Sequence, residues 1–309
     1  MERSGGDVMQ EFKNLKDLPE EDYLTGGSSA CAGCGPSMEL KLALKALGPD
    51  TLVVNASGCM TLLPLYPNTP LKVSWIHNAI ENAASTAAGA RHGLDMLGEK
   101  DMNIVVYAGD GATYDIGFAS LSSVATKNER IIYICYNNQS YGNTGFQWST
   151  ATPYGSETKT TPRGKENPIG TTYVHKDMMK IMGAHRVYAA TASLAYPVDF
   201  LNKLVRAKER GGFSYIEILG TCSTGWNFDS RLTVKVSRLA VRCGMWPLYE
   251  IEDGVLTLNK DFNELKPISE FLKLQGRFKA LPPEGVDRLQ TLINEHWAQL
   301  KEYNGQRYV

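Results

Sequence analysis

The sequence predicts an α/β protein built on a doubly wound, mostly parallel sheet, followed by a C-terminal extension. Short apolar and β-branched runs alternate along the chain with segments of helical period, as in βαβ units. One of these runs, Ile104 to Ala108, is continuously apolar, which is typical of a strand buried on both faces. Glycine and small polar residues follow it at once, at the strand end where open α/β sheets bind ligands.

The composition is that of an ordinary globular protein. Its 309 residues are enough for one large domain or two modest ones. The net charge of −1 gives no long-range attraction to nucleic acid or to an anionic membrane. No apolar run approaches the roughly 20 residues of a transmembrane helix, and the N-terminal region lacks the apolar core of a signal peptide. We therefore expect a cytoplasmic protein that binds neither nucleic acid nor membrane.

Three regions are expected along the chain. Residues 1–24 are polar and acidic and are expected to form an N-terminal arm. Residues 25–225 contain the regular alternation of strands and helices and are expected to form the main, ligand-binding domain. In residues 226–309 the pattern changes to a helix, a hairpin that turns at Asp253-Gly254, and charged amphipathic helices. We expect this extension to pack on the main domain or on a partner subunit.

Periodicity and end signals place the individual elements. Strands are expected at 51–55, 104–108, 131–136, 185–190 and 213–219, with the last of these completing the sheet. Helices are expected at 38–47, within 75–98 after a loop, and at 115–126, 175–182, 197–210, 233–242, 268–274 and 283–300. Residues 149–172 lack helical period and are expected to form either a functional lid or a disordered loop.

The most specific motif joins a glycine-rich turn to an asparagine pair across one βα crossover. Gly109 and Gly111 allow a tight turn and a close approach to a ligand. Asp110 and Asn138 offer oxygen ligands at neighbouring strand ends, the donor type that Mg²⁺ combines with phosphate oxygens. Gly-Asp-Gly alone is common in ordinary turns, but its coupling to Asn137-Asn138 is much more specific. The combination resembles the diphosphate-binding motif of thiamine-diphosphate enzymes.

Four of the six cysteines lie in loops of small residues. Cys31 and Cys34 form a C-x-x-C pair, which by itself is compatible with a redox dithiol, zinc or an iron–sulfur cluster. A zinc site would call for a second closely spaced pair, and none exists. Together with Cys59 and Cys222, the pair supplies enough thiolates for one [4Fe–4S] cluster. The other two cysteines are expected to be small core residues: Cys135 and Cys243.

The chain as a whole resembles the β subunit of a multi-subunit pyruvate (2-oxoacid):ferredoxin oxidoreductase. The resemblance covers roughly residues 20–257 and combines many short motifs in one order. They are Ala30-Cys31-Ala32-Gly33-Cys34-Gly35, Ser57-Gly58-Cys59-Met60, Trp75-Ile76-His77, Glu81-Asn82-Ala83-Ala84, Gly109-Asp110-Gly111, Tyr114-Asp115-Ile116-Gly117, Tyr141 to Gly145, Thr152-Pro153-Tyr154-Gly155, Cys222 with Thr224-Gly225-Trp226, and Trp246-Pro247-Leu248.

The resemblance implies three cofactors: thiamine diphosphate, Mg²⁺ and a [4Fe–4S] cluster. It implies that the cluster is bound by Cys31, Cys34, Cys59 and Cys222, and Mg²⁺ by Asp110, Asn138 and the Ser140 carbonyl. It further implies that the residues around thiamine diphosphate are Gly109, Gly111, Cys34, Gly35, Ser57, Gly58 and His77. Asn143 and Thr144 are implied to lie beside the thiazolium as catalytic residues.

The implied activity is oxidative decarboxylation of a 2-oxoacid, with pyruvate favoured. Electrons pass through the cluster to ferredoxin, and coenzyme A receives the acyl group. The resemblance also implies partner subunits of the α, γ and δ type. The α chain is expected to supply the glutamate for the aminopyrimidine and the arginine for the substrate carboxylate, so this chain alone is expected to be inactive.

Some positions depart from the family's usual pattern. Asn137 stands where aspartate is common, Gln139-Ser140 where Glu-Ala is common, Trp148 where arginine is common, and Ser223 where proline is usual. The first three lie near the active loop, so oxalate, branched-chain and aryl 2-oxoacids are alternative substrates. An alternative of another class is a zinc-stabilised, non-catalytic binding subunit. A dinucleotide-dependent dehydrogenase would need G-x-G-x-x-G after a strand, which is absent.

Overall fold

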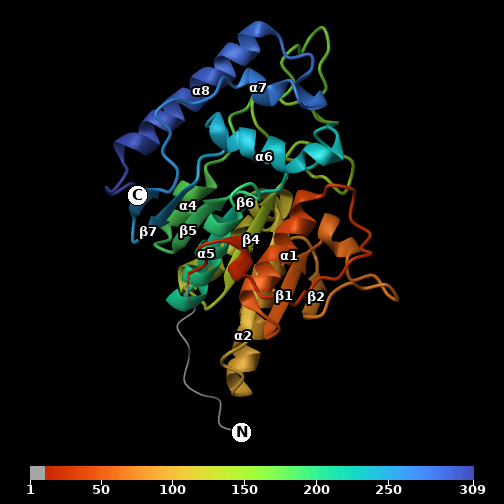
Figure 1. The fold of residues 1–309 in the computed structure, drawn as a ribbon, viewed down its shortest axis with the longest axis vertical. Helices are drawn as coiled ribbons and strands as arrows, with labels where there is room; N and C mark the ends of the chain where they lie inside the picture. Colours follow the sequence, from red (N-terminus) through yellow and green to blue (C-terminus); the bar gives the residue numbers. More distant parts are fainter. Residues whose placement is uncertain (1–10) are drawn as a thin grey trace.

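The computed structural model describes residues 11–309, which build one eight-stranded sheet with helices on both faces (Figure 1). The strand order is β2-β1-β3-β4-β6-β5-β7-β8. The first six strands of this order are parallel, and the hairpin β7–β8 is added antiparallel to β5. The predicted doubly wound, mostly parallel sheet is thereby confirmed. Part of the expected N-terminal arm, residues 1–10, lies outside the described residues.

The bounds of β1, β3, β4 and β6 follow the predicted apolar runs closely, whereas β5, expected at 185–190, begins three residues later and β2 was not predicted. The strands are β1 (Thr51–Ala56), β2 (Ser74–Asn78), β3 (Asn103–Gly109), β4 (Ile132–Asn137), β5 (Tyr188–Ala192), β6 (Ser214–Leu219), β7 (Tyr249–Glu252) and β8 (Val255–Leu258). Strands β3 and β4 lie side by side with Gly109 opposite Tyr136, so their carboxyl ends meet at one edge of the sheet.

Helices cover both faces because strand side chains alternate between them. The α-helices are α1 (Gly35–Leu47), α2 (Ala83–Met96), α3 (Phe118–Lys127), α4 (Met178–Ala184), α5 (Pro197–Arg210), α6 (Thr233–Arg242), α7 (Ser269–Leu272) and α8 (Pro283–Glu302). Helices α1 and α5 pack on one face of the sheet. Helices α2, α3 and α4, with the end of α8, pack on the other.

Shorter turns are the 3₁₀ helices η1 (Leu15–Asp17), η2 (Cys59–Leu62), η4 (Ser230–Leu232) and η5 (Gly276–Phe278), and the π-helical turn η3 (Gly111–Ile116).

Several expected elements are wrong in place or extent, including the helix expected at 115–126, where α3 begins only at Phe118. Residues 74–78, expected as a loop, form the edge strand β2, whose largely exposed pattern gives no buried apolar run to detect. Helix α4 begins at Met178 rather than 175, because the Asp177 carboxylate accepts a hydrogen bond from the Lys180 amide and caps the helix there. The sheet does not end at β6, which lies between β4 and β5, since β7 and β8 extend it further.

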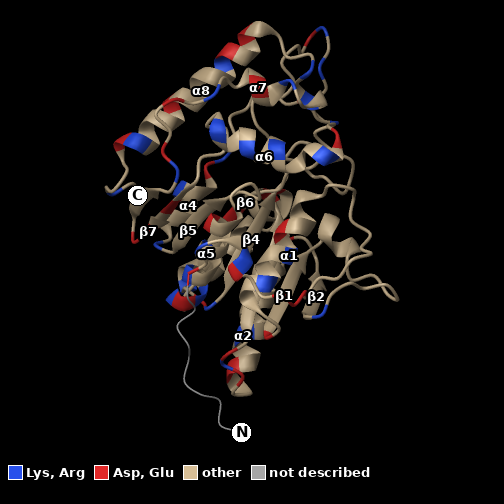
Figure 2. Ribbon diagram, in the orientation of Figure 1, with Lys and Arg blue, Asp and Glu red and all other residues tan. Residues whose placement is uncertain are grey.

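The C-terminal extension forms a third apolar cluster with α6, α7 and α8. In Figure 1, α6 lies between the main sheet and the long helix α8. Charged residues of both signs lie along α8 (Figure 2), whereas strands β1 to β4 contain none. Within residues 11–309, none of the helices has the length and apolar character needed to cross a bilayer.

Candidate cofactor site

A cavity of about 190 Å³ opens at the carboxyl ends of β1, β3 and β4. It brings together most of the predicted site residues, which come from three separate loops, one after each of these strands. Those in its lining are Ser57, Gly58, Cys59, Gly109, Asp110, Gly111, Asn138, Ser140, Asn143 and Thr144. This is the edge at which a parallel sheet binds its ligands.

Among residues 11–309, Asp110 is the only carboxylate in the lining of this cavity, and one of its oxygens has no hydrogen-bond partner. The residue is 1% exposed. Its Oδ2 accepts a 2.5 Å hydrogen bond from the Ser149 hydroxyl, while Oδ1 is buried without a donor. Burial raises the pKa of Asp110 to about 7. A buried carboxylate oxygen without a donor is a position that a cation satisfies well, so the site fits a magnesium ion.

Asn138 lies at the neighbouring strand end and offers a neutral oxygen. Its Oδ1 accepts a 3.2 Å hydrogen bond from the Ser140 amide, which fixes the direction of the side chain. The Trp226 indole donates to the Asn138 carbonyl at 2.9 Å and holds the backbone of the same residue. The arrangement leaves one carboxylate and one amide for a metal that also binds phosphate oxygens.

Glycines keep the cavity open where the backbone approaches it. A Cβ at Gly111 would lie 2.4 Å from the ring of Tyr141. A Cβ at Gly142 would lie 2.8 Å from Asn138 Nδ2 and 3.4 Å from Cys59 Sγ. The second of these positions shows that Cys59 and the candidate metal ligand Asn138 both lie next to Gly142.

The loop of the C-x-x-C pair is docked by the chain around Cys222. Gly33 turns this loop with a φ of +67°. The Ser223 hydroxyl donates to the Ala32 carbonyl at 2.8 Å, and the Gly35 amide donates to the Thr221 carbonyl at 3.1 Å. Ser223, the residue found in place of the usual proline, thus takes part in joining two cysteine loops.

The four predicted cluster ligands are free thiols in these docked loops. Cys31 is exposed, and the other three are partly buried. Burial, with a smaller contribution from neighbouring thiols, raises the pKa of Cys34 to about 11 and that of Cys59 to about 12. Burial also raises the pKa of Cys222. These thiols ionise readily only when a bound cation stabilises the thiolates, as iron does.

The four cysteines are close enough to interact, but they do not form a compact single-ion site. Among residues 11–309, no three His, Cys, Asp or Glu side chains are arranged to hold one metal ion. A cubane cluster binds each thiolate at a different iron atom, so its ligands surround a larger centre. The remaining cysteines, Cys135 and Cys243, are buried in the core as predicted.

The residues predicted to be catalytic and the predicted histidine lie at the mouth of the cavity. Asn143 and Thr144 are exposed. The Thr144 hydroxyl donates to Gln147 Oε1 at 2.6 Å, which stabilises the loop. His77 is also exposed and reaches the cavity through Ser57, whose Oγ lies 2.8 Å from His77 Nε2.

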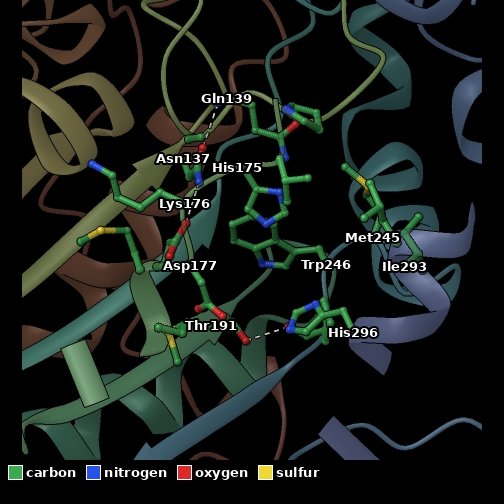
Figure 3. A pocket seen from close by; sticks show the side chains of 18 of the residues that line it. Asn137, Gln139, His175, Lys176, Asp177, Thr191, Met245, Trp246, Ile293 and His296 are labelled. Atoms are coloured by element: carbon green, nitrogen blue, oxygen red, sulfur yellow. Dashed lines mark hydrogen bonds between the residues drawn. The ribbon is translucent and has the colours of Figure 1, made fainter. Parts of the chain in front are cut away.

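Asn137 and Gln139 face a second cavity, also of about 190 Å³, rather than the first (Figure 3). Successive residues at the end of β4 alternate in direction, so Asn138 and Ser140 line the first cavity while Asn137 and Gln139 line the second. His175, Trp246 and His296 lie in the same second cavity (Figure 3). Two of the departures from the family pattern therefore lie beside the candidate cofactor cavity and not within it.

Sequence reasoning missed several residues that shape the site. Ser149 bonds Asp110 from the irregular segment 149–172, where it is fully buried. Glu217 is buried beneath Asn137, whose amide donates to its carboxylate at 2.6 Å. Arg277 donates to Gln139 from the C-terminal extension at 2.8 Å. None of these three stands in a recognisable motif, and only the fold brings them to the site.

Comparisons with known proteins agree with the fold. A family model described as "Thiamine pyrophosphate enzyme, C-terminal TPP binding domain" matches residues 56–218. The pyruvate synthase subunit PorB of Methanothermobacter thermautotrophicus is 45% identical over 92% of this chain and 99% of its own length. The ketoisovalerate oxidoreductase subunit VorB of Pyrococcus horikoshii is 39% identical over 96% of this chain and 98% of its own length.

A solved structure shares the fold at lower sequence identity. It is the 2-oxoglutarate:ferredoxin oxidoreductase from Magnetococcus marinus, with a TM-score of 0.54 and 20% identity over 75% of this chain and 83% of that chain. The fold, the Asp110–Asn138 edge and the matched family model define a protein with a thiamine-diphosphate-binding domain. At the level of the whole chain, the protein belongs to the β subunits of the 2-oxoacid:ferredoxin oxidoreductases.

Proposed function

We propose that this chain is the thiamine-diphosphate and iron–sulfur subunit of an enzyme that oxidatively decarboxylates pyruvate. One observation supports the proposal most strongly: a predicted cluster ligand, Cys59, is also part of the lining of the candidate metal-diphosphate cavity. Cys59 lines the cavity that contains Asp110, and Cys34 and Cys222 lie on loops bonded to each other next to it. A cluster in these loops would lie beside the cofactor, where it can receive electrons.

The residues of this chain bind and orient the cofactor in the proposed reaction. Asp110, Asn138 and the Ser140 carbonyl would hold Mg²⁺ and, through it, the diphosphate of the cofactor. Thiamine diphosphate supplies the nucleophilic carbon that makes decarboxylation of a 2-oxoacid possible. Asn143, at the mouth of the cavity, donates a hydrogen bond to the 2-oxo oxygen as negative charge develops there.

A cluster held by Cys31, Cys34, Cys59 and Cys222 is the proposed electron exit to ferredoxin. Coenzyme A is the proposed acyl acceptor. The remaining acid–base group comes from a partner subunit, because Asp110 is the only carboxylate in the cavity lining and is committed to the metal. The exposed mouth formed by His77, Asn143 and Thr144 is the side from which an α-type subunit would complete the site.

The substrate proposal rests on relatives. Proteins named pyruvate synthase subunits reach 45% identity, and ketoisovalerate oxidoreductase subunits 39%. Pyruvate is therefore proposed first and a branched-chain 2-oxoacid second. The test is anaerobic purification of the chain with its partner subunits, followed by a viologen-dye assay of pyruvate, ketoisovalerate, aryl 2-oxoacids and oxalate, each with and without coenzyme A.

We expect dye reduction to be fastest with pyruvate and to require coenzyme A. We expect the protein in the same preparation to be brown and to absorb at about 400 nm, as thiolate-bound iron–sulfur clusters do. A colourless, zinc-containing and inactive complex would instead support the non-catalytic binding subunit.

A further inference from the structure

The C-terminal extension places a buried positive charge near the loops that carry Cys222 and Asn138. Arg277, in η5, is only 6% exposed. In the described part of the chain, its side chain donates two hydrogen bonds, and both go to neutral amide oxygens, Gln139 Oε1 at 2.8 Å and Gln275 Oε1 at 2.9 Å. Most buried charges pair with an opposite charge, so a buried guanidinium held by amides alone is unusual.

Arg277 is stacked on Trp226, which links the two cofactor loops. The guanidinium carbon lies 3.8 Å from the centre of the indole ring. The Trp226 amide donates to the Cys222 carbonyl at 3.0 Å, and the Trp226 indole donates to the Asn138 carbonyl at 2.9 Å. Arg277 therefore lies one side chain away from a proposed cluster ligand and from a proposed metal ligand.

The charge of Arg277 interacts with those of Cys222 and Asp110. Burial lowers the pKa of Arg277, while the anionic forms of Cys222 and Asp110 raise it. A guanidinium remains protonated in proteins even when buried, so the positive charge is retained. Because Gln139 is neutral, it holds the guanidinium in place without cancelling this charge.

We propose that Arg277 is a positioning residue that also raises the reduction potential of the cluster bound by this chain. A fixed cation stabilises the reduced cluster more than the oxidised one, because the reduced form is more negative by one charge. The neutral partner Gln139 makes this effect larger than a carboxylate at the same position would allow. The proposal rests on the cluster assignment made above.

Redox titration of the whole complex, monitored by electron paramagnetic resonance, tests the proposal. The signal of this chain's cluster is the one that disappears in Cys222→Ala. Arg277→Gln removes the charge, Arg277→Lys keeps it, and Gln139→Glu neutralises it while retaining a hydrogen-bond acceptor. The control is Arg163→Gln, which removes a guanidinium that donates to the Arg277 carbonyl at 3.0 Å and pairs with Glu157.

Arg277→Gln and Gln139→Glu are both expected to lower the potential. We expect roughly a tenfold fall in the ratio of reduced to oxidised cluster at a fixed potential. For a one-electron couple this fall corresponds to a reduction potential lower by about 59 mV. Arg277→Lys and Arg163→Gln are expected to leave the ratio within about threefold of wild type, well short of that change.

The outcomes separate the two assignments. An unchanged potential in Gln139→Glu, with the cluster signal intact, would overturn the role of Arg277. Equal shifts in Arg277→Gln and Arg277→Lys would also overturn it, since they would indicate packing rather than charge. If Cys222→Ala removes no signal, the cluster assignment itself fails, irrespective of Arg277.

Discussion

At the scale of single residues, Asp110 is suited to binding a cation at some cost to the stability of the cofactor-free protein. Its pKa is raised to about 7 by burial, whereas an unfolded chain ionises it near 3.8. The native state therefore holds a proton that the unfolded state has lost, so stability falls as pH rises from about 4 to about 7. Metal binding requires the ionised form, so cofactor affinity should weaken below about pH 7.

Asp110→Asn separates these two effects. The variant should lose Mg²⁺-dependent binding of thiamine diphosphate, measured by calorimetry. In the absence of cofactor it should be more stable than wild type at about pH 8, because no charge is buried. Melting temperatures measured between about pH 5 and pH 8 should fall for wild type and stay nearly flat for the variant. Parallel pH profiles, or unchanged cofactor affinity, would count against the metal-ligand role.

Asn143 is expected to act on the reaction rather than on cofactor binding. Hydrogen-bond donors aimed at developing charge contribute about 10²–10³ in rate. Asn143→Ala should lower kcat by roughly that factor, with cofactor and iron content unchanged. Steady-state rates at verified full occupancy measure the effect. A kcat within about threefold of wild type, well short of that range, would remove Asn143 from the catalytic residues, and weaker thiamine binding would indicate a loop-stabilising role instead.

At the scale of elements, the docking of the C-x-x-C loop depends on Gly33. A Cβ there would lie 2.4 Å from the Ser230 carbonyl oxygen, and the backbone has a positive φ of +67°. Gly33→Ala should therefore displace the loop from η4 and the start of α6 and lower the iron content of the complex. Gly26→Ala is the matched control, because a Cβ at Gly26 meets nothing within 4 Å. Equal iron content in both variants would show that cluster assembly does not need this docking.

The elements that could be predicted from sequence are those with strong local signals. Helix α5 has a proline at its first turn, a glycine after its end and an amphipathic period, and its predicted bounds are confirmed. Strand β3 and the Gly109-Asp110-Gly111 turn could also be predicted, from the apolar run and from the glycines that follow it. The edge strand β2 could not be predicted, because its exposed residues form no buried pattern. The contacts of Ser149 and Arg277 could not be predicted either, because tertiary packing brings both residues to the site from irregular segments.

At the scale of the whole molecule, we propose that a partner subunit completes the cofactor cavity of this chain. Its mouth is exposed, and its lining has a single carboxylate, which faces the proposed metal. The chain alone should bind thiamine diphosphate yet show no 2-oxoacid oxidation, and addition of its partner subunits should restore activity. Assays of the chain with and without its partners test this. Turnover by the chain alone would contradict the proposed division of labour.

The central claim is that four cysteines from three separate segments hold one cluster beside the thiamine site. It is tested most directly by the iron content of the anaerobically purified complex carrying Cys222→Ala or Cys135→Ala. Cys222 lies in a docked loop next to the cavity, whereas Cys135 is buried within β4. The account predicts that Cys222→Ala loses most of about four iron atoms per chain and that Cys135→Ala loses none. Equal iron content in the two variants would contradict it.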